Sequence, residues 1–248
     1  MSIEHILNDF PSFIPGARQV DKYLFRKSEA VLVHIRQMHS ISEMDDKLHK
    51  EIAKTNKELA DTLKQNSRKL AEKADNGKVL RVQDDIYSIL NHLSQRNGVI
   101  DVYSEGFTEE FVDMYNMMQP YLEKERGMAN INLFREGKIN IKAAETIETN
   151  CNAMQKLWER KSLYRNYDHI FTAREQKSLE FISQDNQEIA YLIFGAAHDF
   201  YYALKKWNRK HKKMSLIEIT PCNIFYRNET SQKKNHRKLT KFRMNCLS

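Results

Sequence analysis

The sequence predicts an α/β domain with a largely parallel or mixed central sheet, flanking helices and a projecting helical insertion. Three short apolar runs carry this prediction, at residues 30–35 (AVLVHI), 99–103 (VIDVY) and 189–194 (IAYLIF). Runs of this length with little alternation are typical of strands covered on both faces. Because helical patterns separate the runs, we expect crossover connections and a parallel sheet.

The composition is that of an ordinary globular domain. The chain has 248 residues, 41% hydrophobic and 29% charged, which is enough for one well-buried domain. No window approaches the roughly 18 apolar residues of a membrane span, and the first ten residues lack a signal-peptide pattern. Cys151, Cys222 and Cys246 lie far apart without CxxC spacing, so neither a disulfide framework nor a thiolate zinc site is expected. This pattern favours a reduced, cytoplasmic setting.

The predicted elements alternate along the chain. A short helix near the N-terminus leads into a stretch that Pro11, Pro15 and Gly16 interrupt, and then into the first strand. After the insertion the order is a helix at 82–96, a strand at 99–103, a helix at 108–126, a short strand at 138–141 and a helix at 143–163. The last elements are a helix at 174–183, a strand at 189–194, a helix from 198 to 213 and a strand at 214–219.

The insertion at about 42–80 carries a narrower apolar pattern than the rest of the chain. Within 42–75, leucine and isoleucine follow one another at spacings of four and seven, at Leu48, Ile52, Leu59, Leu63 and Leu70. A helix buried in a core would show a wider apolar stripe. We therefore expect a projecting helix that contacts one neighbour, and through it a homodimer.

The net charge of +7 is not spread evenly. Basic residues gather at 205–213 and at 222–248, whereas residues 1–204 are net acidic. We therefore expect a single α/β domain over 1–221 and a basic, disordered tail over 222–248. Such a tail can contact nucleic acid or an anionic membrane, although charge runs of this kind are more often simply solvated.

The loops after three predicted strands each bring a side chain that can bind metal. His39 follows the first strand, Glu105 the second and His198 the third. Ligand sites in open α/β sheets lie at the carboxyl ends of the strands, so these groups are expected at one edge. Two His and one Glu can hold a catalytic divalent metal, which lowers the pKa of its bound water. The plainer alternative is that each is a loop or core residue.

Five segments carry a further pattern in a fixed order. They are VLVHIRQMHS (31–40), QDDIYSILNHLSQRNGVIDVYSEGF (83–107), GKINIKAAE (137–145), YRNYDHI (164–170) and IAYLIFGAAHDFYYALKKWNRKHKKMSLIEITP (189–221). Together they resemble the superfamily that groups Tiki proteases, TraB pheromone-shutdown proteins, erythromycin esterases and ChaN-type haem-binding proteins. The pattern of that superfamily is two GxxH motifs, a Glu between them and an Arg-Asn or Arg-Asp pair before the second.

The motif positions can be matched one by one. The second GxxH falls on Gly195 and His198, the Glu on Glu105, and the pair on Arg165 and Asn166. The resemblance implies that these groups meet in one pocket with His39.

Three further positions are less closely matched. The first GxxH falls on Arg36–His39, with Arg36 in place of the glycine, where it could repel a metal or pair with Glu105 or a substrate carboxylate. Glu145 lies where relatives often have another acid, or it is a helix N-terminal charge. His34, inside the first strand, is a further candidate.

Two functions from different classes follow. The first is a metal-dependent hydrolase of peptide or ester bonds, with zinc, manganese or cobalt held by His39, Glu105 and His198. Glu105 is then a ligand or the general base, and Arg165 stabilises the developing oxyanion. The second is a non-catalytic protein of the same fold that binds haem or holds a partner, since one fold hosts many activities.

Overall fold

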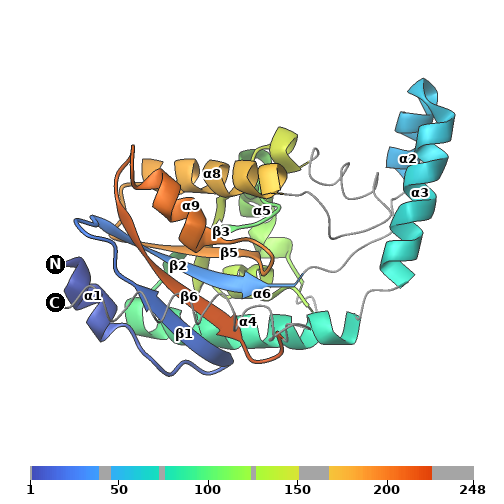
Figure 1. Ribbon diagram of the computed structural model, residues 1–248. Helices are drawn as coiled ribbons and strands as arrows, with labels where there is room; N and C mark the ends of the chain where they lie inside the picture. The colour runs from blue at the N-terminus through green and yellow to red at the C-terminus, as the bar shows by residue number, and fades with distance from the viewer. Residues whose placement is uncertain (1, 39–45, 73–75, 124–126, 151–167, 225–248) are drawn as a thin grey trace.

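A six-stranded mixed sheet organises the protein (Figure 1). The computed structural model describes residues 2–38, 46–72, 76–123, 127–150 and 168–224. The strand order is β1-β6-β2-β5-β3-β4, and only the edge strand β1 runs antiparallel to its neighbour. The strands are β1 (Ala17–Tyr23), β2 (Ala30–Gln37), β3 (Ile100–Ser104), β4 (Ile139–Ala143), β5 (Ile189–Gly195) and β6 (Met214–Pro221). The predicted α/β fold is therefore confirmed.

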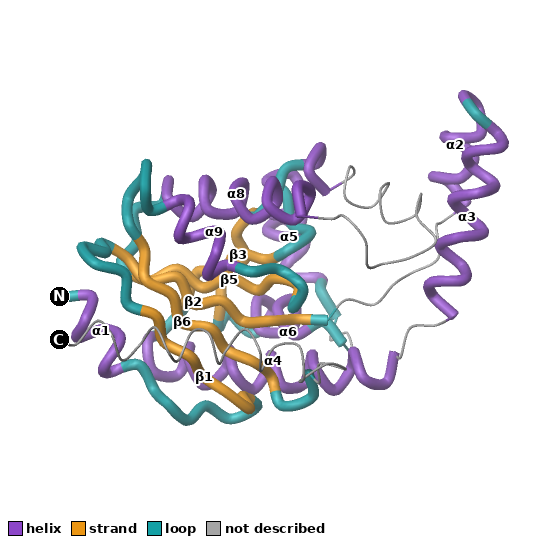
Figure 2. The backbone as a smooth tube through the Cα atoms, viewed as in Figure 1, coloured by secondary structure: helices purple, strands orange, loops and turns teal. Residues whose placement is uncertain are grey.

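Helices cover both faces of the sheet (Figure 2). One face packs against α1, α4 and α6, and the other against α8 and α9. The helical elements are α1 (Ile3–Asp9), α2 (Asp46–Thr55), α3 (Lys57–Glu72), α4 (Asn76–Asn97), α5 (Glu109–Met118), the 3-10 helix η1 (Gln119–Tyr121), α6 (Ala129–Arg135), α8 (Asp168–Gln184) and α9 (Phe200–Trp207). No helix in these described ranges is long and apolar enough to cross a membrane.

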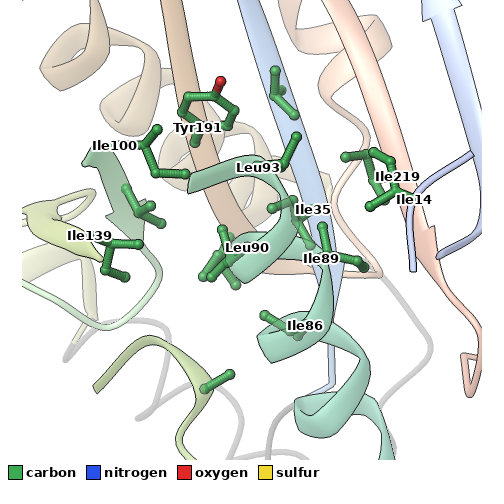
Figure 3. Packing of buried hydrophobic residues seen from close by; sticks show 14 of the residues in the cluster. Ile14, Ile35, Ile86, Ile89, Leu90, Leu93, Ile100, Ile139, Tyr191 and Ile219 are labelled. Carbon is green, nitrogen blue, oxygen red and sulfur yellow. The ribbon is translucent and has the colours of Figure 1, made fainter. Parts of the chain in front are cut away.

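The larger core lies between α4 and the sheet (Figure 3). Ile86, Ile89, Leu90 and Leu93 recur at helical spacing and are fully buried against the strands, where they meet residues such as Ile35. Burying side chains of this size stabilises a fold by about 1.5–3 kcal/mol each. This apolar stripe anchors α4 against β1, β2, β3 and β6.

Two elements of the structure are absent from the sequence prediction. The structure adds β1. The sequence predicts an irregular stretch there, because prolines interrupt it and no apolar run marks a strand. The residues of β1 are partly exposed, which explains the missing apolar run. The structure also adds the short helix α6 within a region without clear periodicity. The expected helix at 143–163 lies mostly outside the described residues.

The insertion is a pair of helices rather than the single projecting helix that we expected. The helical run breaks at Asn56, and α3 packs back on α2 with Ala60 and Leu63 buried. An ion pair joins Lys64 of α3 to Asp46 of α2. A hydrogen bond of 2.9 Å between His49 Nε2 and Asp61 Oδ1 links the same two helices. The hairpin stands away from the sheet, as expected (Figure 1). A homodimer through it stays a prediction.

The tail that we expected to be disordered over 222–248 begins with an ordered segment. Asn223 donates a hydrogen bond from its amide to Asp85, and Ile224 is 2% exposed, so disorder is wrong for these residues. Residues 225–248 lie outside the described residues, and disorder there stays a prediction.

Removal of a core side chain should test the packing of α4. Leu90→Ala leaves a cavity beneath the sheet, because Leu90 has no exposed surface. We expect a loss of about 2–5 kcal/mol in the free energy of unfolding, measured by urea denaturation with circular dichroism. Leu24→Ala is the matched control, since Leu24 is 53% exposed and should change stability by less than about 0.5 kcal/mol. Equal effects would contradict this packing.

Candidate functional site

The carboxyl ends of the parallel strands carry most of the described polar groups that the sequence singled out. Glu105 follows β3, Glu145 follows β4, and Gly195 ends β5. His198 comes three residues later, just before α9. His34 and Arg36 lie in β2. The remaining three candidates, His39, Arg165 and Asn166, lie outside the described residues.

Arg174 of α8 joins two of these carboxylates. Its Nη2 lies 2.7 Å from Oε1 of Glu105, and its Nε lies 2.5 Å from Oε1 of Glu145. All three side chains are largely buried, and Glu145 is fully so. The two carboxylates raise the pKa of Arg174, against the opposing effect of burial, so the guanidinium keeps its charge. Glu145 is therefore a buried, paired carboxylate, and it precedes the helical residues 147–150.

Backbone amides fix the orientation of both carboxylates. The amide of Gly195 donates a hydrogen bond of 2.5 Å to Oε2 of Glu105. The amide of Gly106 donates one of 2.7 Å to Oε2 of Glu145. Gly106 has a φ of 82°, a backbone conformation that favours glycine and that turns its amide toward Glu145. Each carboxylate is therefore held by a main-chain donor as well as by Arg174.

His198 lies beside Glu105 but does not share a hydrogen bond with it. Its Nε2 is 3.9 Å from Oε1 of Glu105, and its Nδ1 is 3.3 Å from Oε1 of Glu175. The imidazole is 3% exposed and meets the ring of Phe194 edge-on at 4.5 Å. His198 is therefore a buried side chain between two carboxylates, which supports the predicted proximity of His198 and Glu105.

A second polar cluster lies on the same face of the sheet, between β2 and β6. The parallel register places His34 directly beside Glu218, and Arg36 follows on the same side of β2. Arg36 Nη2 lies 2.5 Å from Oε2 of Glu218, and His34 Nδ1 lies 3.4 Å from Oε1. Arg36 thus pairs with Glu218. The predictions that it repels a metal or pairs with Glu105 or a substrate carboxylate stay predictions. The strand register decides this pairing.

Glu218 keeps its charge despite its burial. Burial alone would raise its pKa, but the hydrogen bond with His34 and the charge of Arg36 outweigh that effect and hold the pKa at about 2. His34 has no exposed surface and also contacts the carbonyl oxygen of Phe194 at 3.3 Å. His34 therefore belongs to this structural cluster and not to the group around Glu105.

Sequence reasoning missed two side chains that organise these clusters. Arg174 lies on a helix, where nothing in the local pattern distinguishes it from a solvated arginine. Glu218 did leave a signal, because it is the only charge between residues 214 and 221 and stands in a strand that is buried throughout. A charge in such a strand indicates a buried partner.

A pocket of about 310 Å³ opens beside Glu105, on the face of the sheet opposite Arg174. Helices α4, α5 and α6 and the loops after β2 and β3 form its walls. The polar residues that line it are Gln37, Gln83, Glu105 and Asn130, and the apolar ones include Met38, Phe107, Phe111, Met114, Tyr115, Met128 and Ile131. The volume is typical of the lower range of small-molecule pockets.

The described donors do not fit a divalent metal. No group of three or more His, Cys, Asp or Glu side chains within the described ranges could hold a metal ion. Oε1 of Glu105 is paired with Arg174, and Oε2 accepts the amide of Gly195. A cation at Glu105 would lie close to this guanidinium and be repelled by its charge. The predicted ligand set also needs His39, which lies outside the described residues.

Comparisons with known proteins identify no family for this chain. No protein-family model matches the chain, and neither the curated proteins nor the solved structures contain a match. The resemblance to the Tiki and TraB superfamily therefore stays a prediction carried by the sequence segments. The site has to be interpreted from its own residues.

The low pKa of Glu218 predicts a loss of stability in acid. A carboxyl whose pKa is lower in the folded state stabilises the fold above its unfolded pKa of about 4.5, and this contribution disappears as the pH falls toward 2. Its size is about 3 kcal/mol for this pKa difference. Urea denaturation at pH 6 and pH 3 should show a smaller acid loss for Glu218→Gln than for the native protein.

Glu180→Gln is the control for this measurement. Glu180 is exposed on α8, so its removal should leave the acid loss at the native value. A Glu218→Gln variant that loses as much stability in acid as the native protein would contradict the pairing with Arg36 and His34.

Proposed function

We propose that the protein is a hydrolase of ester or peptide bonds, with its active site in the pocket beside Glu105. One observation carries the proposal. The Glu105 carboxylate lines a pocket with apolar walls and is held in one orientation by Arg174 and the Gly195 amide. A fixed carboxylate next to a binding pocket is suited to general base catalysis.

The charge balance supports a role for Glu105 as a base. Glu105 and Glu145 share a single guanidinium, so the group of three carries one excess negative charge when both carboxylates are ionised. Arg174 faces Glu105 from the α8 side of the sheet, and the pocket opens from the α4 side. Glu105 therefore has an orienting partner on one side and room for a water and a substrate on the other.

The chemical steps use this arrangement. Glu105 takes a proton from a water molecule, and the water oxygen forms a bond to the substrate carbonyl carbon. The amide side chains of Gln37, Gln83 and Asn130 line the same pocket. Nε2 of Gln37 donates a hydrogen bond of 3.4 Å to Oε2 of Glu105, and Nδ2 of Asn130 donates one of 3.3 Å to Ser104. The second N–H of each amide and the amide of Gln83 are the donors proposed for the carbonyl oxygen as its negative charge develops. Glu105 then returns the proton to the leaving oxygen or nitrogen as the old bond breaks. No step is assigned to a metal ion, because the His, Cys, Asp and Glu side chains of the described ranges form no group of three that could hold one.

Glu105→Gln should remove hydrolysis without unfolding the domain. The amide keeps the shape of the side chain but cannot accept the proton, so we expect a fall of about 10²–10⁴-fold in kcat/KM. The measurement uses p-nitrophenyl acetate and butyrate and a mixed fluorogenic peptide library. Glu180→Gln, which removes an exposed carboxylate from α8, is the control and should retain full activity.

Two outcomes would contradict the hydrolase. One is unchanged turnover by a folded Glu105→Gln variant. The other is a native protein that hydrolyses none of these substrates, with or without added zinc, manganese or cobalt. If activity needs one of these metals, the metal-dependent form predicted from the sequence is supported, and Arg174 must then release Glu105.

A non-catalytic binding protein is the second candidate, favoured by the methionines of the pocket. Met38, Met114 and Met128 give it an adaptable apolar wall, and Tyr115 provides a side chain that can bind haem iron. Titration with haemin should then give a saturable Soret band that Tyr115→Phe shifts or abolishes. Tyr121→Phe is the control, since Tyr121 is 81% exposed. Haemin binding without saturation, or equal spectra for both variants, would contradict this candidate.

A further inference from the structure

The end of the sheet opposite the pocket carries exposed basic side chains from two distant parts of the chain. We name as the basic patch Arg26, Lys27, Lys205, Lys206, Arg209 and Lys210, all of which are exposed. The first two lie in the connection from β1 to β2, and the others on α9 and in its connection to β6. Figure 1 shows both connections at the same end of the sheet.

Two interactions join the two parts of the patch. The ring of Phe25 lies 5.7 Å from that of Tyr201, which places Arg26 next to the first turn of α9. The amide of Glu29 donates a hydrogen bond of 2.8 Å to the carbonyl oxygen of Lys213. The patch is therefore a property of the folded domain and not of one charge run.

The patch keeps its positive charge. None of its six side chains makes a salt bridge to another residue of the described ranges. The acidic side chains at this end include Glu29, Asp101, Asp185 and Glu188, and Lys142 lies 3.7 Å from Asp101 and 3.3 Å from Asp185. Residues 222–248 hold seven Lys or Arg against one Glu, so they add to the positive charge of the chain. A polyanion is the complementary partner.

Aromatic rings lie among these charges. Tyr202 is 56% exposed and stands one helical turn from Lys205 and Lys206. The neighbouring Tyr201 ring lies 5.5 Å from that of Tyr202, with Nζ of Lys205 5.3 Å from the Tyr201 centroid. Basic side chains around exposed aromatic rings suit a single-stranded nucleic acid, because phosphates meet the charges and bases stack on the rings.

A membrane surface fits this part of α9 less well. The apolar residues of α9, namely Phe200, Ala203, Leu204 and Trp207, are buried against the sheet. A helix that lies in a membrane surface needs an exposed apolar face to enter the acyl region. The exposed side of α9 offers Tyr202, Lys205 and Lys206, and the hollow that Tyr202 and Lys206 line also contains Glu175 and Asp199. We therefore propose that the basic patch binds single-stranded nucleic acid, with Tyr202 as a stacking platform for a base.

Fluorescence anisotropy with labelled single-stranded oligonucleotides tests the proposal on the full chain. The probes are 20-nucleotide oligo(dT) and oligo(rU), with a 20-base-pair duplex and heparin for comparison. We expect Arg209→Glu/Lys210→Glu to weaken binding of both single strands by at least tenfold at 50 mM salt. The slope of the logarithm of the association constant against the logarithm of the salt concentration should become shallower. We expect a change of about 0.7 for each phosphate that the variant no longer neutralises.

The matched control changes the net charge equally at another place. Lys50→Glu/Lys57→Glu removes two exposed lysines of the α2–α3 hairpin and should leave binding near the native value. Tyr202→Ala should weaken single-strand binding about fivefold or more while heparin binding stays the same, because only bases can stack.

Four results would overturn the proposal. The first is no binding of either single strand by the native protein at 10 µM. The second is an equal loss in the patch and hairpin variants, which would indicate a response to net charge alone. The third is an unchanged affinity of Tyr202→Ala for single strands. The fourth is patch-dependent binding to anionic phosphatidylserine vesicles without oligonucleotide binding, which would assign the patch to a membrane.

Discussion

The buried guanidinium of Arg174 is the interaction on which the candidate site depends. It connects α8 to the ends of β3 and β4 through Glu105 and Glu145. Removing one partner from such a buried group leaves an uncompensated charge, which typically costs about 3–5 kcal/mol. Because the carboxylates also accept main-chain amides, the position of Glu105 is set by three different segments of the chain. A side chain held in this way needs no reorientation before it acts.

Glu105 also lies where the two helical layers meet. Arg174 and His198 come from the α8 and α9 side of the sheet, whereas α4, α5 and α6 form the walls of the pocket. A ligand in the pocket that shifts the Glu105 carboxylate would therefore also shift its partner Arg174 on α8. The second cluster, around Glu218, lies on the α9 side as well, and the ring of Phe194 separates it from the first.

Two charged clusters of the domain lie at opposite ends of its sheet. The carboxylates of Glu105 and Glu145 lie at the carboxyl ends of β3 and β4, while the basic patch lies at the opposite end near α9. The division follows from the parallel topology, which brings all loops after the strands to one end and all loops before them to the other. A small-molecule site and a polyanion site can therefore coexist without facing each other.

The sequence by itself determined the layers and part of the site. Apolar runs such as 30–35 and the helical stripe from Ile86 to Leu93 predict which residues are buried. Glu105 and His198 follow predicted strands, so the sequence also predicts where they lie. Only the tertiary structure decided the partners. Arg174 reaches Glu105 from 69 residues away, and Arg36 meets Glu218 through the register of β2 and β6. Local pattern reports how much each residue is buried, but pairing between distant charges depends on strand order and register, which no single segment encodes.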